Sequence, residues 1–308
     1  MKKLLKMISP FNAQEKMPIA LFCLKKLFAF VFVFFASIIL AEGLTIIIHY
    51  IMGYNVLQGE MLSAQAMTLM KYYGYAVFIF VAILYCRFIE KRTIKSMGFN
   101  GKIFGYLKGI LIGIALLAAS IGIIVLTGNI SYNGVLKDID YPIILVFLGA
   151  FVIQGAMEET LCRGFLMTSL SKKVSIPLAI FISSLAFAVP HFSSLFAGDL
   201  IFGLLGIINL LLVSTIFALL MINDRNIWIA CGMHSFWNFC LFNVFGLNLS
   251  GSGKKPTAIF DFSIDAENLM NGGAYGIEAS VITTAVLAIC AIILVLKYRK
   301  NKTVTIQF

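Results

Sequence analysis

Two adjacent glutamates, Glu158 and Glu159, lie in the middle of a long apolar segment. An ionisable side chain costs about 2.5–3.5 kcal/mol to insert there, so both need an explanation. Arg163 follows Glu159 by four residues, which puts the two side chains on one helical face and lets the guanidinium hold that carboxylate ionised. Glu158 is turned by about 100° from this pair and has no cation near it along the helix. A lone carboxylate in apolar surroundings is a strong proton acceptor, which favours a general base at Glu158.

A histidine ends the next apolar segment, with His191 four residues after Phe187. The turn between the two segments is centred near residue 174, about 16 residues after Glu158 and about 17 before His191. Because a helix rises about 1.5 Å per residue, both side chains should sit at nearly the same depth and face each other across the hairpin. The sequence therefore predicts a carboxylate and an imidazole that face each other at the same depth.

A third pair lies further along the chain, where His234 and Asn238 are four residues apart and share one helical face. An imidazole and an amide offer hydrogen-bond donors to an oxygen that becomes negatively charged during a reaction. A structural hydrogen bond between helices is the alternative interpretation of this pair.

The elements that must position these residues are membrane helices. Of the 308 residues, 60% are hydrophobic and 12% are charged, with a mean hydropathy of +0.97. Soluble domains are about one quarter charged, so the composition excludes an ordinary soluble protein. The apolar runs are continuous rather than alternating, which favours helices over a β-barrel. We predict an all-α polytopic membrane protein with about eight transmembrane helices and its active site inside the bundle. The predicted spans are 27–51, 72–89, 103–127, 141–170, 177–191, 200–222, 227–246 and 277–296.

The 24 lysines and arginines are unequally divided between the two sides of this topology. Twenty fall on the side of both termini and four (Lys71, Lys137, Lys254 and Lys255) on the other. This asymmetry predicts a multi-pass protein of the cell membrane with both termini cytoplasmic, and it explains the net charge of +10 without a nucleic-acid partner. The predicted organisation is a basic tail (1–26), three helices (27–127), a four-helix core (141–246), an outer loop (247–276) and a last helix with a basic tail (277–308).

Together the three motifs carry a resemblance. Glu158-Glu159-x-x-x-Arg163, Phe187-x-x-x-His191 and His234-x-x-x-Asn238 resemble the CAAX protease and bacteriocin-processing family of intramembrane proteases, which includes the type II CAAX prenyl endopeptidases. The stretch Gly272-Gly273-x-x-Gly276-x-Glu278 resembles the start of the family's last helix, and Glu278 is expected at the membrane interface.

The resemblance implies an endopeptidase acting on a membrane-associated or lipidated peptide or protein. It implies that Glu158 and His191 activate water and that His234 and Asn238 stabilise the oxyanion; Glu159, Arg163 and Phe187 would support them. Three alternatives stay open: a zinc ion held by Glu158, His191 and His234, a bacteriocin-immunity or peptide-binding protein without catalysis, and a proton-coupled transporter. Closely spaced ligand pairs such as HExxH are absent, which favours a reaction without a metal. Internal repeats are also absent, which counts against a transporter.

Overall fold

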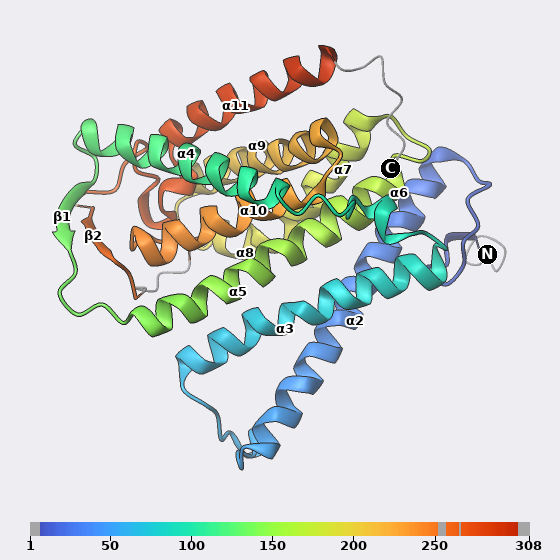
Figure 1. Cartoon of the computed structure of the whole chain (residues 1–308), viewed down its shortest axis with the longest axis horizontal. Helices are drawn as coiled ribbons and strands as arrows, with labels where there is room; N and C mark the ends of the chain where they lie inside the picture. The colour runs from blue at the N-terminus through green and yellow to red at the C-terminus, as the bar shows by residue number, and fades with distance from the viewer. Residues whose placement is uncertain (1–6, 252–256, 265, 301–308) are drawn as a thin grey trace.

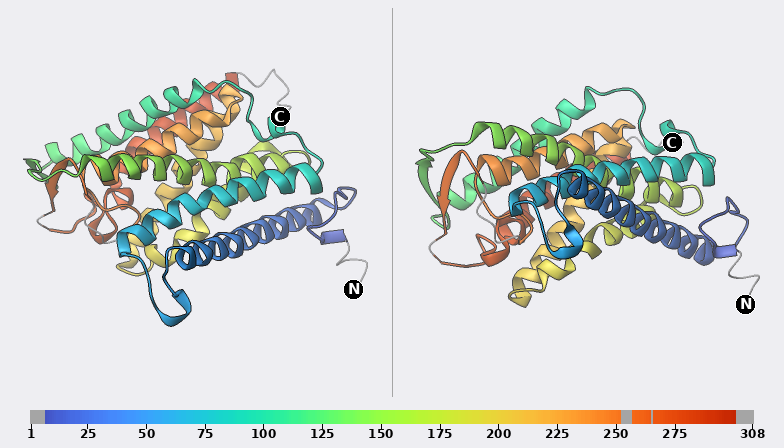
Figure 2. Two further views of the ribbon diagram at one scale, coloured as in Figure 1. Left: turned by 60° about the horizontal axis from the view of Figure 1, so that its bottom comes forward. Right: turned by 90° about the horizontal axis from the view of Figure 1, so that it is seen from below.

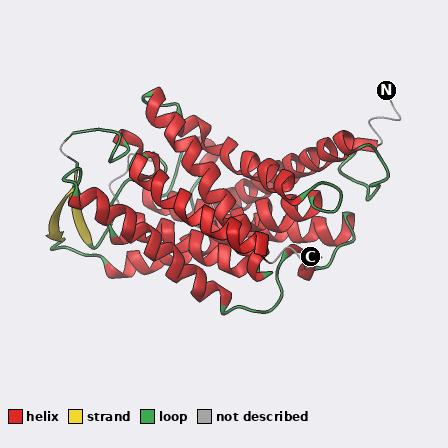
Figure 3. Cartoon of the chain, turned by 90° about the horizontal axis from the view of Figure 1, so that it is seen from above, coloured by secondary structure: helices red, strands yellow, loops and turns green. Residues whose placement is uncertain are grey.

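The computed structural model describes residues 7–251, 257–264 and 266–300. Long helices run side by side through the molecule, and a small two-stranded sheet closes one end (Figures 1 and 3). Seven of the described helices are long and apolar enough to cross a membrane. The prediction of an all-α polytopic membrane protein is therefore confirmed.

The first three long helices are α2 (Ile19–Ile51), α3 (Ala64–Leu84) and α4 (Gly105–Leu126). The first was predicted to begin at residue 27, which is wrong, because Pro18 starts the helix directly before Ile19. Lys25 and Lys26, which were assigned to the basic tail, therefore lie in α2, where both side chains are buried. The second begins before the predicted residue 72, at the N-cap Ser63, whose hydroxyl accepts the Ala66 N–H at 3.3 Å. Figure 2 shows α2 and α3 running together along one side of the bundle.

The Glu158–His191 hairpin is built from short consecutive pieces. α5 (Tyr141–Glu159) continues into a π-helical stretch, Thr160–Met167, and then α6 (Thr168–Leu170). α7 (Ile176–Ala188) returns, and a 3-10 turn at Val189–His191 leads to α8 (Phe192–Leu195). Ser175 is the N-cap residue of α7, but its side chain makes no capping hydrogen bond.

The second hairpin joins α9 (Leu200–Asp224) to α10 (Ile227–Phe239), which continues as a π-helical stretch, Cys240–Val244. Arg225 takes a left-handed conformation at the turn, and the Asn226 side chain accepts the Trp228 N–H at 3.1 Å. The predicted span 227–246 is thus helical, although it is not among the seven helices that qualify by length and composition. α11 (Val281–Lys300) ends the described chain.

α10 lies at the centre of the bundle, where it contacts α4, α5 and α9. Glycines bring the backbones together: a Cβ on Gly109 of α4 would lie 2.1 Å from the Ile229 carbonyl oxygen, and one on Gly232 would lie 2.1 Å from the Tyr106 carbonyl oxygen. Gly105, Gly109 and Gly113 follow the small-residue spacing that lets membrane helices approach closely. The helix that carries His234 and Asn238 is therefore shielded on several sides.

The connections after α4 and α10 pair as β1 (Ser131–Val135) and β2 (Phe260–Ser263), two antiparallel strands with Ser131 opposite Ser263. Short 3-10 helices lie at Val56–Gln58, Ile94–Met97, Gly273–Tyr275 and Ile277–Ala279. The beginning of α2 and the end of α11 lie at the end of the bundle opposite the strands (Figure 1). Some of the charges used in the orientation prediction lie outside the described residues: Lys2, Lys3, Lys6, Lys254, Lys255 and Lys302.

Candidate active site

A buried ion pair supports the site. Arg163 and Glu159 are both fully buried, and the Arg163 Nη1 donates to Glu159 Oε1 at 3.0 Å, as the four-residue spacing predicts. The Arg163 Nη2 donates to the Ser214 carbonyl oxygen at 3.0 Å and to its hydroxyl at 2.5 Å. The guanidinium also lies over the rings of Phe187 and Phe217, at 4.7 and 5.1 Å from their centroids. Arg163 thereby joins the Glu159 helix to α7 and α9.

His234 is held by this ion pair. Its Nδ1 lies 2.9 Å from Glu159 Oε1, the oxygen that also accepts from Arg163. Because a carboxylate only accepts, Nδ1 carries the proton of this hydrogen bond. The imidazole stacks on Phe217 with the ring centroids 4.8 Å apart. The second nitrogen, Nε2, consequently faces Glu158, with 3.8 Å between Nε2 and Glu158 Oε2.

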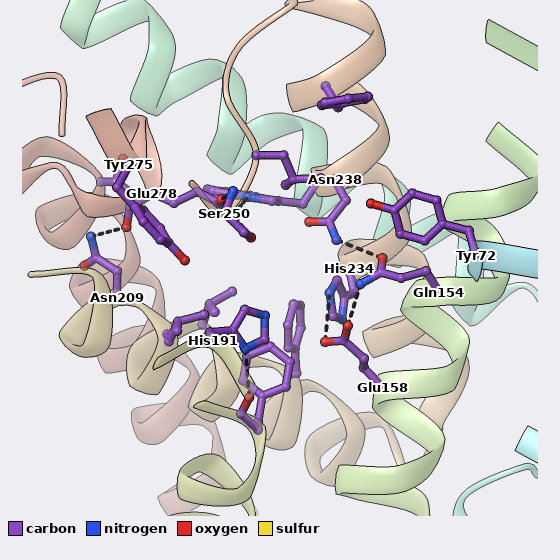
Figure 4. Close-up of a pocket in the computed structure, with 18 of the residues that line it drawn as sticks. Tyr72, Gln154, Glu158, His191, Asn209, His234, Asn238, Ser250, Tyr275 and Glu278 are labelled. Atoms are coloured by element: carbon purple, nitrogen blue, oxygen red, sulfur yellow. Dashed lines mark hydrogen bonds and ion pairs between the residues drawn. The ribbon is translucent and has the colours of Figure 1, made fainter. Parts of the chain in front are cut away.

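Glu158 has one oxygen held and one oxygen free. Its Oε1 accepts from Gln154 Nε2 at 2.6 Å, and Gln154 Oε1 in turn accepts from Asn238 Nδ2 at 2.9 Å. Its Oε2 is buried and has no hydrogen-bond partner among the described residues. The hydrogen bonds from Asn238 to Gln154 and from Gln154 to Glu158 fix the Glu158 carboxylate and leave its Oε2 directed at the cavity (Figure 4).

His191 stands at the end of α7, in the 3-10 turn. Its Nδ1 lies 3.0 Å from the Phe187 carbonyl oxygen, which accepts the Nδ1 proton, so Nε2 is the ring nitrogen left for the cavity. Figure 4 shows the imidazole of His191 on the opposite side of the cavity from Gln154 and Glu158.

Two neighbouring cavities, of about 360 and 410 Å³, meet at the predicted residues. Glu158, His191 and Phe187 line both of them, together with Lys71 and Tyr75. His234 and Asn238 line the first cavity, whereas Glu159 and Arg163 line neither and lie behind the cavity wall. The structure thus brings the four predicted catalytic side chains together.

Gln154 and Glu278 were not predicted as site residues. Glu278 lines the first cavity and lies three residues before α11 begins, and its expected place at the membrane interface stays a prediction. Its Oε1 accepts from Trp237 Nε1 at 3.2 Å and its Oε2 from the Ser250 N–H at 2.7 Å. Burial raises the pKa of this carboxyl, although both donors act in the opposite direction. Gln154 could have been found by its spacing, four residues before Glu158 on the same face.

The metal alternative needs a set of converging ligands. No group of three or more His, Cys, Asp or Glu side chains with metal-site geometry occurs in the described part of the chain. Glu158, His191 and His234 are thus not grouped in this way among the described residues, and a reaction without a metal stays a prediction.

Residues 140–240 match the family model described as type II CAAX prenyl endopeptidase Rce1-like. The matched region runs through α5 to the beginning of the π-helical stretch after α10, and it contains all three motifs. No curated protein and no solved structure matches the chain. The match confirms the resemblance to the CAAX protease family, and with the seven apolar helices it identifies a membrane protein.

Proposed function

We propose that this protein is an intramembrane endopeptidase in which Glu158 and His191 activate the attacking water. The observation that carries the proposal is the Oε2 oxygen of Glu158, which is buried, free of hydrogen-bond partners among the described residues and directed at a cavity that His191 also lines. A carboxylate oxygen in this state is ready to accept a proton from water. The region that matches the CAAX endopeptidase model contains both residues.

The reaction follows from the atoms at the cavity. A water molecule held between Glu158 Oε2 and His191 Nε2 gives a proton to Glu158, and its oxygen attacks the carbonyl carbon of the scissile peptide bond. The C–N bond then breaks, and the proton passes from Glu158 to the leaving amine. One peptide bond and one water thus become a carboxylic acid and an amine.

The developing oxyanion needs hydrogen-bond donors. Asn238 Nδ2 uses one proton for Gln154 and keeps a second for the substrate. His234 contributes Nε2 when both of its ring nitrogens are protonated, because Nδ1 is already engaged by Glu159. Donors placed in advance at such a position are worth about 10²–10³ in rate each.

The substrate is a membrane-associated or lipidated peptide or protein, and the protein lies in the cell membrane with both termini cytoplasmic. A bacteriocin-immunity or peptide-binding protein without catalysis would use the same cavities, and it is the alternative that the experiment must separate. A proton-coupled transporter would also need buried carboxylates, but the free oxygen of Glu158 faces a cavity shared with two histidines and an amide.

Glu158→Gln tests the proposal, because the amide keeps the size and the contact with Gln154 while it loses basicity. The assay measures the rate at which new peptide termini form in membranes that contain the protein. This rate should be about 10²–10⁴-fold lower with Glu158→Gln than with the wild-type protein. Glu42→Gln is the matched control, since Glu42 lines the second cavity from α2 outside the proposed machinery. Cleavage by folded Glu158→Gln at the rate of the control would refute the water-activating role. Peptide binding by wild type without cleavage would favour the non-catalytic alternative.

A further inference from the structure

The first cavity at Glu158 and His191 is lined by residues from one end of the bundle, and neither cavity is lined by the turns at the other end. The first is lined by Thr68 and Lys71 near the start of α3, by Ser250 and Tyr275 from the connection after α10, and by Thr283 at the start of α11. The starts of α3 and α11 lie toward the end of the bundle that carries β1 and β2 (Figure 1). The second cavity is lined by side chains from four segments: residues 30–45 of α2, residues 70–78 of α3, residues 157–162 and residues 186–191. Neither cavity is lined by a residue of the α9–α10 turn or of the α6–α7 turn.

The opposite direction is filled by side chains. Behind the site lie Glu159 and Arg163, both with 0% exposure, and beyond them Phe165, Met221 and Ile227, which are also at 0%. Glu159 Oε1 is bound to Arg163 and His234, and Arg163 Nη2 is bound to Ser214, whereas Glu159 Oε2 and Arg163 Nε are buried without a partner among the described residues. These buried side chains separate Glu158 from the end of the bundle at which α2 begins.

Charges distinguish the two ends. The end with the α6–α7 and α9–α10 turns carries most of the described lysines and arginines, including Lys95, Lys102, Lys172, Arg225 and Lys297. Exposed acidic residues gather on the connections at the other end: Glu60, Asp138, Asp140, Asp199, Asp261 and Glu267. Because basic loops stay in the cytoplasm, the end of the bundle that lines the first cavity is expected on the opposite side of the membrane.

We propose that the site takes its water and its substrate from the extracytoplasmic side. The substrate class is then a peptide segment presented on that side, exported or anchored in the outer leaflet, rather than a cytoplasmic lipidated C-terminus. This inference rests on the proposed function in so far as the bound peptide is a substrate. The side from which the cavity is reached is a property of the cavity and can be measured without activity.

The experiment introduces single cysteines into the full-length protein and labels them with a small, permanently charged methanethiosulfonate. Val213→Cys lies in the wall of the first cavity, Asp138→Cys marks the strand end and Lys172→Cys marks the basic end. The wild-type protein gives the background from its own six thiols, of which four are buried and two half-buried, with Cys162 in the wall of the second cavity. Intact cells expose the extracytoplasmic side, and inside-out vesicles expose the cytoplasmic side.

We expect the reagent to modify Val213→Cys and Asp138→Cys in intact cells at least tenfold faster than in inside-out vesicles, and Lys172→Cys in the reverse order. Modification of Val213→Cys from the same side as Lys172→Cys would overturn the inference, as would modification of Val213→Cys from neither side. If the reagent modified all three variants preferentially from the side opposite to the expected one, the extracytoplasmic assignment would be overturned. The labelling rates do not depend on catalysis, so failure of the proposed function shows separately, as unchanged cleavage by Glu158→Gln.

Discussion

Replacement of Arg163 by methionine tests whether the buried ion pair holds the site. Arg163→Met removes the 3.0 Å contact with Glu159, two hydrogen bonds to Ser214 and the stacking over two phenylalanine rings. It leaves a fully buried carboxylate with His234 as its remaining hydrogen-bond partner among the described residues. Removing one partner of such a pair typically costs about 3–5 kcal/mol, because the other charge stays desolvated.

The free energy of unfolding, measured by titration of the detergent-solubilised protein with a denaturing detergent, should fall by that amount. The double variant Glu159→Gln with Arg163→Met is the control, since it removes both charges and should recover part of the loss. A loss below about 1 kcal/mol in Arg163→Met would refute the reasoning. A double variant whose free energy of unfolding falls by more than the sum of the two single losses would refute it as well.

Three further predictions concern the oxyanion, acid stability and metal. Asn238→Ala should stay folded and lose about 10²–10³ in cleavage rate, measured as the rate constant under single-turnover conditions; a loss below twofold would contradict the donor role. Glu90 is buried, which raises its pKa, but its paired cations outweigh burial and hold that pKa below the ordinary value of about 4.5. Its contribution to stability is therefore complete above that value and is lost as the pH falls through the lowered pKa, so wild type should lose more stability than Glu90→Gln in acid unfolding curves. Chelation should leave the cleavage rate unchanged. The metal-free mechanism would be wrong if the purified protein held stoichiometric zinc, if both His191→Ala and His234→Ala lost this zinc, and if zinc restored activity after chelation.

The depth of the chemical residues could be predicted from the sequence because a helix rises by a fixed amount per residue. Glu158 and His191 are nearly equidistant from their turn, and the structure places both on the same two cavities. The pairing of Glu159 with Arg163 follows from the same regularity. These predictions needed only the position of one turn and the helical period.

Contacts between helices that are distant in the sequence could not be predicted in this way. Gln154 bridges Asn238 and Glu158 only because α5 and α10 lie side by side, and nothing in either segment fixes that neighbour. Glu278 lies in an irregular connection, where no period indicates which side chain turns inward. The start of α2 was missed because two lysines looked like the end of an apolar run, whereas Lys26 is paired with Glu90 at 2.7 Å.

The helix that holds two of the four proposed catalytic residues is also the one that hydropathy identifies least well. α10 carries His234, Ser235 and Asn238, and it does not qualify as a membrane span by length and composition. Its polar groups are tolerated because α4, α5 and α9 shield it from lipid and because glycine contacts let those helices approach closely. A bundle that does hydrolytic chemistry needs polar donors at its centre, and those donors lower the apolar signal of the helix that bears them. In a protein of this kind, a weak span flanked by strong ones therefore indicates where the chemistry lies.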